Sequence, residues 1–195
     1  MKKWILILFS LWIVNAGIAQ TWAKKYDHVN DAVGGLILVG KDNKHGFVDK
    51  NGKVVVPLIY DEALAFSEGI AAVMQNYKWG YIDSTGKIIV ELQYSEAWSY
   101  HDNLAVVGKG SDYGFINKKG EIIIPLIYGN ARGFSDGLAA VMNQKGKWGY
   151  IDANGKVLIP FKFTFADTYA DGIARVMEKS TMYYIDLTGV KVKDL

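Results

Sequence analysis

The sequence has no cysteine, three prolines and almost no excess of charge of either sign, and each shortage narrows the choice of fold and function. Without cysteine the chain is neither a small disulfide-stapled domain nor a cysteine-ligated zinc protein. Its 22 basic and 20 acidic residues leave a net charge of +2. Nucleic-acid-binding domains typically carry clustered basic charge, so this class is disfavoured. With 50% hydrophobic residues the chain can form a folded core rather than remain disordered.

Long apolar runs are missing as well, except at the N-terminus. Two lysines precede Trp4 to Val14, an apolar stretch of 11 residues in which Ser10 is polar, and small residues follow it. This pattern is typical of a signal peptide, residues 1–19, with cleavage after Ala19. A membrane-spanning helix needs about 20 apolar residues, so an uncleaved anchor is the weaker alternative.

Cleavage would change the net charge of the protein and would accompany its export from the cytoplasm. Removing Lys2 and Lys3 leaves 20 basic against 20 acidic residues, so residues 20–195 are formally neutral. We therefore expect an exported protein, periplasmic or secreted, without a nucleic-acid partner and without a membrane span after cleavage.

The rest of the chain is a tandem repeat. The hexapeptide Lys-Trp-Gly-Tyr-Ile-Asp occurs at 78–83 and again at 147–152, with diverged copies at 44–49 and 112–117 and a shorter one at 182–186. A glycine follows each copy, and the spacings between these glycines are 34, 34, 35 and 34 residues: Gly52, Gly86, Gly120, Gly155, Gly189. The residues that define the repeat most clearly are Gly46, Trp79, Gly80, Gly86, Gly114, Gly120, Trp148, Gly149 and Gly155.

Each repeat unit is predicted to contain three short strands, such as 69–74, 79–83 and 87–90. The apolar segments are β-branched or aromatic and are separated by Gly, Asn and Asp, which favours strands over the paired helices of a tetratricopeptide array of similar period. Between the second and third strands, an Asp or Asn opens a turn and the glycine closes it in a left-handed conformation. Connections of about ten residues, such as 60–69, are expected to link the units.

We therefore predict an all-β fold with a single domain over residues 20–195, made of five three-stranded antiparallel units. The units would stack as an open, solenoid-like array. A closed five-bladed propeller-like ring is the alternative, because five whole units could also close a circle and the rotation between units is not written in the sequence.

The repeated motif is similar to that of the WG-repeat proteins, which are named for the Trp-Gly pair in Lys-Trp-Gly-x-Ile-Asp-x-x-Gly. The resemblance covers residues 44–189. It implies an all-β repeat array, often secreted or associated with the cell envelope, and it brings no catalytic residues with it. The chain departs from the pattern at His45, Tyr113 and Tyr183 in the Trp or Gly positions, and at Glu91 in the Pro position.

Signatures of catalysis or of metal binding are weak. Each turn offers one carboxylate, whereas a calcium loop needs several converging oxygens, and three histidines with no cysteine do not form a zinc pattern. No Gly-x-Ser-x-Gly nucleophile turn is present. We expect a protein that is not an enzyme and has no catalytic residue, cofactor or metal.

Aromatic residues give the strongest indication of function. Most are expected to fill the core between units: Tyr60, Phe66, Trp79, Tyr94, Tyr128, Phe134, Trp148. A binding surface is more plausible where the units differ, in the column Leu64, Trp98, Arg132 and Asp167, with Tyr100 and His101 beside Trp98. The sequence predicts a protein-interaction or scaffolding module; the alternative is a carbohydrate-binding module that stacks a surface glycan on exposed aromatics.

Overall fold

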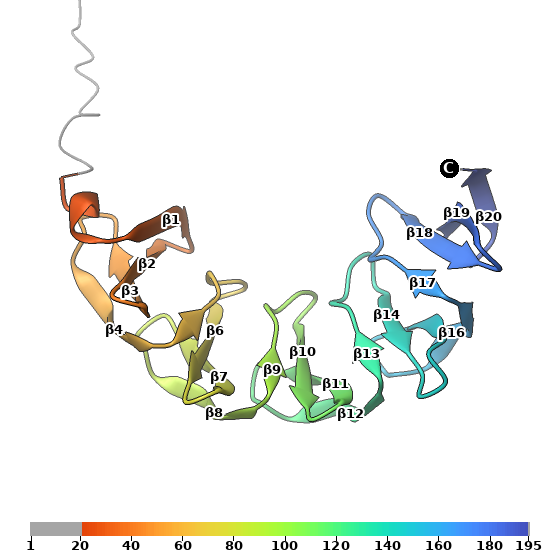
Figure 1. The fold of residues 1–195 in the computed structure, drawn as a ribbon, viewed down its shortest axis with the longest axis horizontal. Helices are drawn as coiled ribbons and strands as arrows, with labels where there is room; N and C mark the ends of the chain where they lie inside the picture. Colours follow the sequence, from red (N-terminus) through yellow and green to blue (C-terminus); the bar gives the residue numbers. More distant parts are fainter. Residues whose placement is uncertain (1–20, 195) are drawn as a thin grey trace, which may run out of the picture.

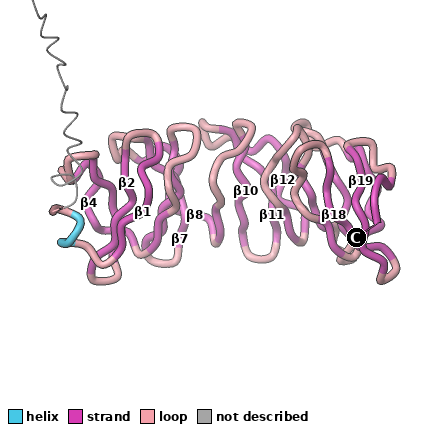
Figure 2. The backbone as a smooth tube through the Cα atoms, turned by 90° about the horizontal axis from the view of Figure 1, so that it is seen from above, coloured by secondary structure: helices cyan, strands magenta, loops and turns pink. Residues whose placement is uncertain are grey.

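The computed structural model describes residues 21–194 and shows five four-stranded antiparallel sheets arranged as an open arc (Figure 1). Seen from above, the sheets follow one another in a single row (Figure 2). The predicted all-β repeat fold is confirmed, and the arc is open rather than a closed five-bladed ring. We call each sheet a blade. A short 3-10 helix, η1 (Ala23–Lys25), precedes the first blade.

In every blade the strands are connected in sequence order from one edge of the sheet to the other. The first blade contains β1 (His28–Val33), β2 (Leu36–Lys41), β3 (Lys44–Asp49) and β4 (Val54–Tyr60). The second contains β5 (Glu62–Ala63), β6 (Ile70–Gln75), β7 (Lys78–Asp83) and β8 (Ile88–Tyr94). The third contains β9 (Glu96–Ala97), β10 (Leu104–Lys109), β11 (Asp112–Asn117) and β12 (Ile122–Tyr128).

The last two blades repeat this order. The fourth contains β13 (Asn130–Ala131), β14 (Ala139–Met142), β15 (Trp148–Ile151) and β16 (Val157–Phe163). The fifth contains β17 (Phe165–Ala166), β18 (Ile173–Glu178), β19 (Thr181–Asp186) and β20 (Lys191–Asp194). In Figure 1, β1 and β17 lie nearest the hollow of the arc, while β4, β8, β12 and β20 lie on its convex side.

The units have four strands instead of the three predicted, because a short strand forms within the segment predicted as a connection. In the second blade this strand is Glu62–Ala63, which pairs with Met74 and Val73. Two residues are too few to show the alternation that marks a strand in a sequence. In the first blade the corresponding strand is β1, which pairs with β2.

The glycine of the repeated motif lies in the third strand, where the backbone of the fourth strand passes close to it. A Cβ added at Gly80 would come within 2.5 Å of the Val90 carbonyl oxygen, and the register between β7 and β8 shifts at this point. Gly46, Gly114 and Gly149 meet the same carbonyl in their own blades. The motif therefore keeps a glycine because the backbone of the outer strand occupies the space of a side chain.

The turns between third and fourth strands form as predicted. In the second blade, an Asp83 carboxylate oxygen accepts hydrogen bonds from the Thr85 and Lys87 amides at 2.8 and 3.1 Å. The Gly86 amide donates to the Asp83 carbonyl, and Gly86 has φ +87°. An L-residue rarely adopts this φ, which explains why a glycine recurs at this position.

At each interface between neighbouring blades, two aromatic rings pack with their planes about 60° apart. The pairs alternate between phenylalanine and tyrosine, with ring centroids 4.7–5.0 Å apart: Phe47–Phe66, Tyr81–Tyr100, Phe115–Phe134 and Tyr150–Tyr169. Such a pair contributes roughly 1 kcal/mol beyond its buried area. The remaining predicted core aromatics are buried, except Trp79, which is partly buried.

The tyrosine interfaces also use their hydroxyl groups. Tyr81 and Tyr100 donate to the carbonyls of Trp98 and Asn117, at 2.8 and 2.9 Å. Burial raises the pKa of both phenols well above the ordinary value, so each remains a neutral donor. A buried hydroxyl needs a partner. For Tyr81 it is a backbone carbonyl of the following blade, and for Tyr100 a backbone carbonyl of its own blade.

The predicted signal peptide, residues 1–19, lies outside the described residues. Within residues 21–194, no helix is both long and apolar enough to cross a membrane.

Candidate functional site

The candidate site is built from the first strands and the segments that follow them, at the hollow side of the arc. In the third blade, residues 98–101 continue from β9 and are tied to β10 at two points. The Trp98 amide donates to the Val106 carbonyl and the His101 amide to the Leu104 carbonyl, each at 3.0 Å.

A groove of about 360 Å³ lies along these segments and crosses four blades. We call it the concave groove. It is lined by Leu64 of the second blade, by Trp98, Ser99 and His101 of the third, by Gly133, Phe134 and Ser135 of the fourth, and by Thr168 of the fifth. No single blade could form it, since each contributes at most three residues.

Trp98 is the main apolar surface of the groove. Trp98 is 40% exposed, whereas the aromatic residues of the core are buried. The Trp98 carbonyl accepts the Tyr81 hydroxyl from the preceding blade at 2.8 Å, which fixes the backbone beneath the indole. An exposed indole on a fixed backbone can bind a ligand with little loss of conformational entropy.

Three of the six residues predicted as a binding surface line the groove: Leu64, Trp98 and His101. The His101 ring reaches the following blade, where its Cδ2 would lie 3.6 Å from a Cβ added at Gly133. The structure therefore brings together residues that are separated by about one repeat in the sequence.

Arg132 and Asp167 are outside the groove lining: Arg132 links the fourth and fifth blades, whereas the Asp167 carboxylate is paired within the fifth blade. Arg132 Nε donates to the Ala166 carbonyl at 2.8 Å, and its guanidinium lies 5.3 Å from the ring centroids of both Trp148 and Phe165. Asp167 forms an ion pair with Arg175 at 3.0 Å. Both side chains are thus already engaged in contacts within the array.

Tyr100 is in the core rather than on a surface. It is 0% exposed, its ring packs 5.0 Å from Tyr81, and its hydroxyl is bonded to the Asn117 carbonyl. Its position two residues after Trp98 matches Phe66, Phe134 and Tyr169, which are the core rings of the other blades. It offers no area to a ligand in this structure.

Sequence reasoning missed the small residues of the groove, although a signal for them exists. Directly after the varying column, each of four units has a small residue: Ala65, Ser99, Gly133 and Thr168. Small side chains at the same place in successive blades leave the space between them empty, which produces the hollow. The adjacent Ser135 hydroxyl and His101 imidazole add polar groups to it.

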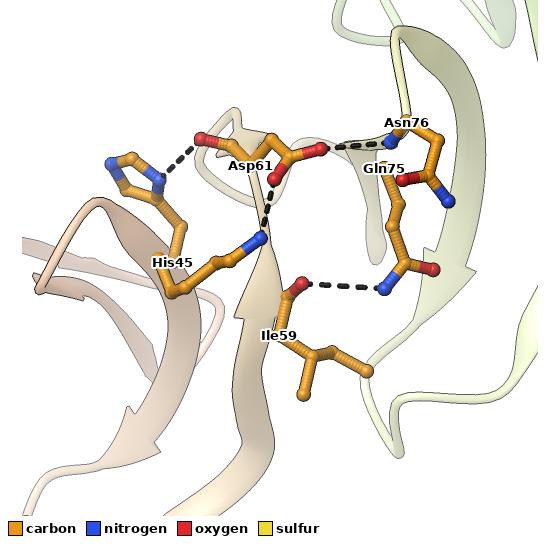
Figure 3. A network of polar contacts seen from close by, with 6 residues as sticks. His45, Ile59, Asp61, Gln75 and Asn76 are labelled. Atoms are coloured by element: carbon orange, nitrogen blue, oxygen red, sulfur yellow. Dashed lines mark hydrogen bonds and ion pairs between the residues drawn. The ribbon is translucent and has the colours of Figure 1, made fainter.

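A separate polar cluster connects the first and second blades (Figure 3). Asp61 accepts a hydrogen bond from the Asn76 amide at 2.8 Å, forms an ion pair with Lys44, and offers its carbonyl to His45 Nδ1 at 3.0 Å. The Lys44 ammonium and the Asn76 amide hold the pKa of the Asp61 carboxyl below its ordinary value. Its groups are paired with one another, so we regard the cluster as a structural link.

Among residues 21–194, no three His, Asp or Glu side chains lie close enough together to hold a metal ion.

The fold is shared with larger proteins. The computationally designed Ika8 protein superposes with a TM-score of 0.55 at 15% identity, covering 86% of this chain and 61% of its own. Kluyveromyces lactis Hsv2 superposes with a TM-score of 0.57 at 12% identity, covering 83% and 60%. A eukaryotic initiation factor gives a TM-score of 0.56 at 14% identity, covering 86% and 54%.

These likenesses concern the fold alone. The chain spans between 54% and 61% of the length of those three structures. Four-stranded antiparallel blades arranged around an axis are the units of β-propellers, and here five of them form an incomplete turn.

Sequence comparison identifies the family. No curated protein sequence matches this chain. Four consecutive segments, residues 46–79, 79–111, 113–148 and 148–180, match the family described as WG containing repeat. These segments cover the repeated motifs from the first blade to the fifth. Each contains the motif glycine that packs against the backbone of the fourth strand. The chain therefore belongs to the WG containing repeat family.

Proposed function

We propose that this protein is a non-catalytic interaction module that binds a segment of another protein in the concave groove. The observation that supports the proposal is the groove itself, which is continuous over four blades and presents the exposed indole of Trp98 beside Leu64. Exposed aromatic residues on a fixed backbone are typical anchors of protein interfaces.

The dimensions of the groove favour a side chain or a short extended segment. A volume of about 360 Å³ is at the lower end of the range for ligand sites, about 300–1,000 Å³. Because the lining comes from successive blades, a ligand that lies along the arc can contact several of them. A scaffolding role would use this surface to hold a partner without altering it chemically.

The experiment is a selection of peptides from a random display library on the immobilised chain, followed by calorimetric titration of the selected peptides. We expect Trp98→Ala to weaken binding at least tenfold while the circular dichroism spectrum is unchanged. Tyr77→Ala is the matched control, because Tyr77 is an 86% exposed aromatic outside the groove lining. Equal weakening by both variants, or none by Trp98→Ala, would contradict the groove as the binding site.

A carbohydrate-binding module is the second candidate. The indole of Trp98 lies in a groove that also contains the hydroxyl groups of Ser99, Ser135 and Thr168, a combination suited to stacking and hydrogen bonding with a sugar ring. A glycan panel with tryptophan fluorescence as readout distinguishes the two. Glycan binding that Trp98→Ala abolishes, together with no selected peptide, would favour this candidate.

We also propose that the protein acts outside the cytoplasm, in the periplasm or as a secreted protein. The support is the basic, apolar and small-residue pattern of residues 1–19. Cell fractionation followed by N-terminal sequencing tests it. The expected first residue of the exported form is Gln20; an uncut N-terminus in the cytoplasm would refute the proposal.

A further inference from the structure

A row of acidic side chains borders the concave groove. Four blades have a carboxylate at the first position of the two-residue turn between their first and second strands: Glu68, Asp102, Asp136 and Asp171. All four are left-handed, with φ between 51° and 54°, so the turns share one geometry. We call these four residues the acidic rim.

Two of the rim carboxylates accept hydrogen bonds from the turn of the following blade. Glu68 Oε2 accepts the Asn103 amide of the third blade at 3.2 Å. Asp136 Oδ2 accepts the Gly172 amide of the fifth blade at 2.8 Å. Each of these carboxylates therefore lies against the corresponding turn of the next blade, and the rim runs along the arc from the second blade to the fifth.

The rim adjoins the groove directly. His101 and Ser135 line the groove, and the rim residues Asp102 and Asp136 follow them in the chain. The apolar surface of Trp98 and Leu64 thus has a border of carboxylates along the turns of the same segments. A ligand that fills the groove would come close to these charges.

Little positive charge compensates the rim. The Lys118 ammonium lies 2.9 Å from Glu68 Oε2. Burial by itself would raise the pKa of the Glu68 carboxyl, but Lys118 and the Asn103 amide outweigh it and hold that pKa below the ordinary value. Among residues 21–194, no hydrogen bond or ion pair engages the side chains of Asp102 or Asp171.

Arg132, the cationic residue nearest in sequence to the groove lining, contacts other groups of the chain. Gly133 lines the groove, but the guanidinium of the preceding Arg132 lies over Trp148 and Phe165 and its Nε is bonded to the Ala166 carbonyl. The carboxylates of Asp102 and Asp171 are therefore available to a cation from outside the chain.

We infer that the occupant of the concave groove is a cationic segment of a partner protein, with an apolar side chain against Trp98 and Leu64 and with Lys or Arg side chains facing Asp102 and Asp171. This inference rests on the proposed protein-binding function and specifies the partner's chemistry. Opposite charge at the border of an apolar contact selects partners and speeds association, and a cation beside an indole gains a further attraction.

The test uses three labelled nine-residue peptides and fluorescence anisotropy with the full chain. The first alternates lysine with leucine and serine, the second has glutamate in place of every lysine, and the third has serine in place of every leucine. We expect the first to bind most tightly and its affinity to fall with salt, because the Debye length shrinks from about 10 Å at 0.1 M to about 3 Å at 1 M.

The variant is the double substitution Asp102→Asn with Asp171→Asn. Removing two exposed charges should weaken binding of the lysine peptide roughly fivefold, in line with the modest strength of single surface pairs. The matched control is Asp42→Asn with Glu91→Gln, which changes the net charge equally but at the β2–β3 turn and on the outer strand β8. We expect the control to bind within twofold of the wild type.

The outcomes separate this inference from the broader proposal. Loss of binding in the rim variant and in Trp98→Ala, but not in the control, would support both. Equal binding of the glutamate and lysine peptides, lost in Trp98→Ala and unaffected in the rim variant, would overturn the inference while the protein-binding function stands. If no peptide of either charge binds and a glycan does, both are overturned.

Discussion

The first and fifth blades differ in how the sheet face at each end of the arc is protected from solvent. Each inner blade packs both faces against neighbours, but the first and fifth blades each have one face without a neighbouring blade within residues 21–194. On the first blade an indole covers that face, whereas on the fifth blade cationic side chains replace the apolar ones. An exposed sheet face can thus be protected either by covering it or by changing its composition.

At the N-terminal end, Trp22 takes the place of a preceding blade. In the inner blades the turn glycine lies against a β-branched residue of the blade before it: a Cβ added at Gly86 would be 3.2 Å from Val56. At Gly52 the corresponding neighbour is Trp22, 2.2 Å from an added Cβ. Trp22 packs with Tyr26 and Leu58 against the buried residues Ile37, Val39 and Val48.

At the other end, two apolar positions have become cationic. Arg175 pairs with Tyr184 in the sheet as Ala72 pairs with Tyr81. Lys193 likewise pairs with Tyr184 where Val90 pairs with Tyr81. Arg175 is bonded to Asp167, and the Lys193 ammonium lies 5.6 Å from the Tyr184 ring centroid. This face therefore lacks the apolar surface on which a further blade would pack.

Disrupting an inner interface should have the largest effect on the free energy of unfolding. This effect is the reference against which the two ends of the arc are compared. Gly86→Val should cost about 3 kcal/mol, because a β-branched residue is strained at φ +87° and its Cβ would press on Val56. Urea unfolding measures it. Gly69→Val is the matched control: φ is +85° but nothing lies within 4 Å, so only the strain remains. Equal losses for both variants would show that packing at the turn contributes nothing.

Removing the N-terminal cover should have the next largest effect. We expect Trp22→Ala to destabilise the protein by about 2 kcal/mol, since the indole packs on three buried aliphatic side chains. Hydrogen exchange should accelerate first in β2. Tyr77→Ala, which removes an exposed ring, should leave both stability and exchange unchanged. Unaltered exchange in β2 of the Trp22→Ala variant would refute the capping role.

Alkaline pH should separate the two ends, because the first interface has a phenylalanine pair and the last a tyrosine pair. Burial raises the pKa of Tyr150 and Tyr169, and burial with the Glu178 carboxylate raises that of Tyr183 to about 12. In the unfolded chain a tyrosine ionises near pH 10. The stability contribution of these neutral phenols is therefore complete below pH 10 and is lost as the pH rises above it.

The double variant Tyr150→Phe with Tyr169→Phe tests this. At neutral pH it should lose about 1 kcal/mol for each hydroxyl-to-carbonyl hydrogen bond, to Asp167 and Asp186. Its stability should then fall less than that of the wild type between pH 8 and about pH 11, measured by urea unfolding with circular dichroism. Tyr77→Phe, at an exposed site, should follow the wild type. Parallel pH profiles for all three proteins would contradict the assignment.

The smallest effect on stability is expected when the C-terminal face is made apolar. Arg175→Ala with Lys193→Val restores the residue types of the inner blades and should change the free energy of unfolding by less than about 0.5 kcal/mol. The exposed apolar face should, however, cause self-association, visible by sedimentation velocity. The control, Lys78→Val with Lys145→Val, removes equal charge at two exposed positions, the start of β7 and the turn between β14 and β15. No greater association than the control shows would mean that the two cations do not protect this face.

Much of the candidate site could be located from the sequence, but not its composition. The varying column pointed to Leu64 and Trp98, because positions that differ between units are free of the packing shared by all. Tyr100 was grouped with Trp98 by proximity in the chain, yet Tyr100 is fully buried and its ring packs against Tyr81 of the preceding blade. Ser99, Gly133 and Thr168 are identified as groove residues only by the structure, which places their blades side by side.

The sequence by itself determined the period, the strands of each unit and the turns that join them. These depend on local properties: β-branched runs, an Asp or Asn that accepts turn hydrogen bonds, and glycines where φ is positive or a strand crosses. It also carried the difference between the ends, since Lys193 and Arg175 break a pattern that the other units keep.

The tertiary structure decided what arises between units. The two-residue strands such as β5 exist because backbone groups pair with the second strand, and no side-chain pattern announces them. The curvature of the arc and its openness follow from the rotation between blades, which the packing of whole faces sets rather than any one residue. The groove and the acidic rim exist because that rotation places equivalent residues of four blades next to one another.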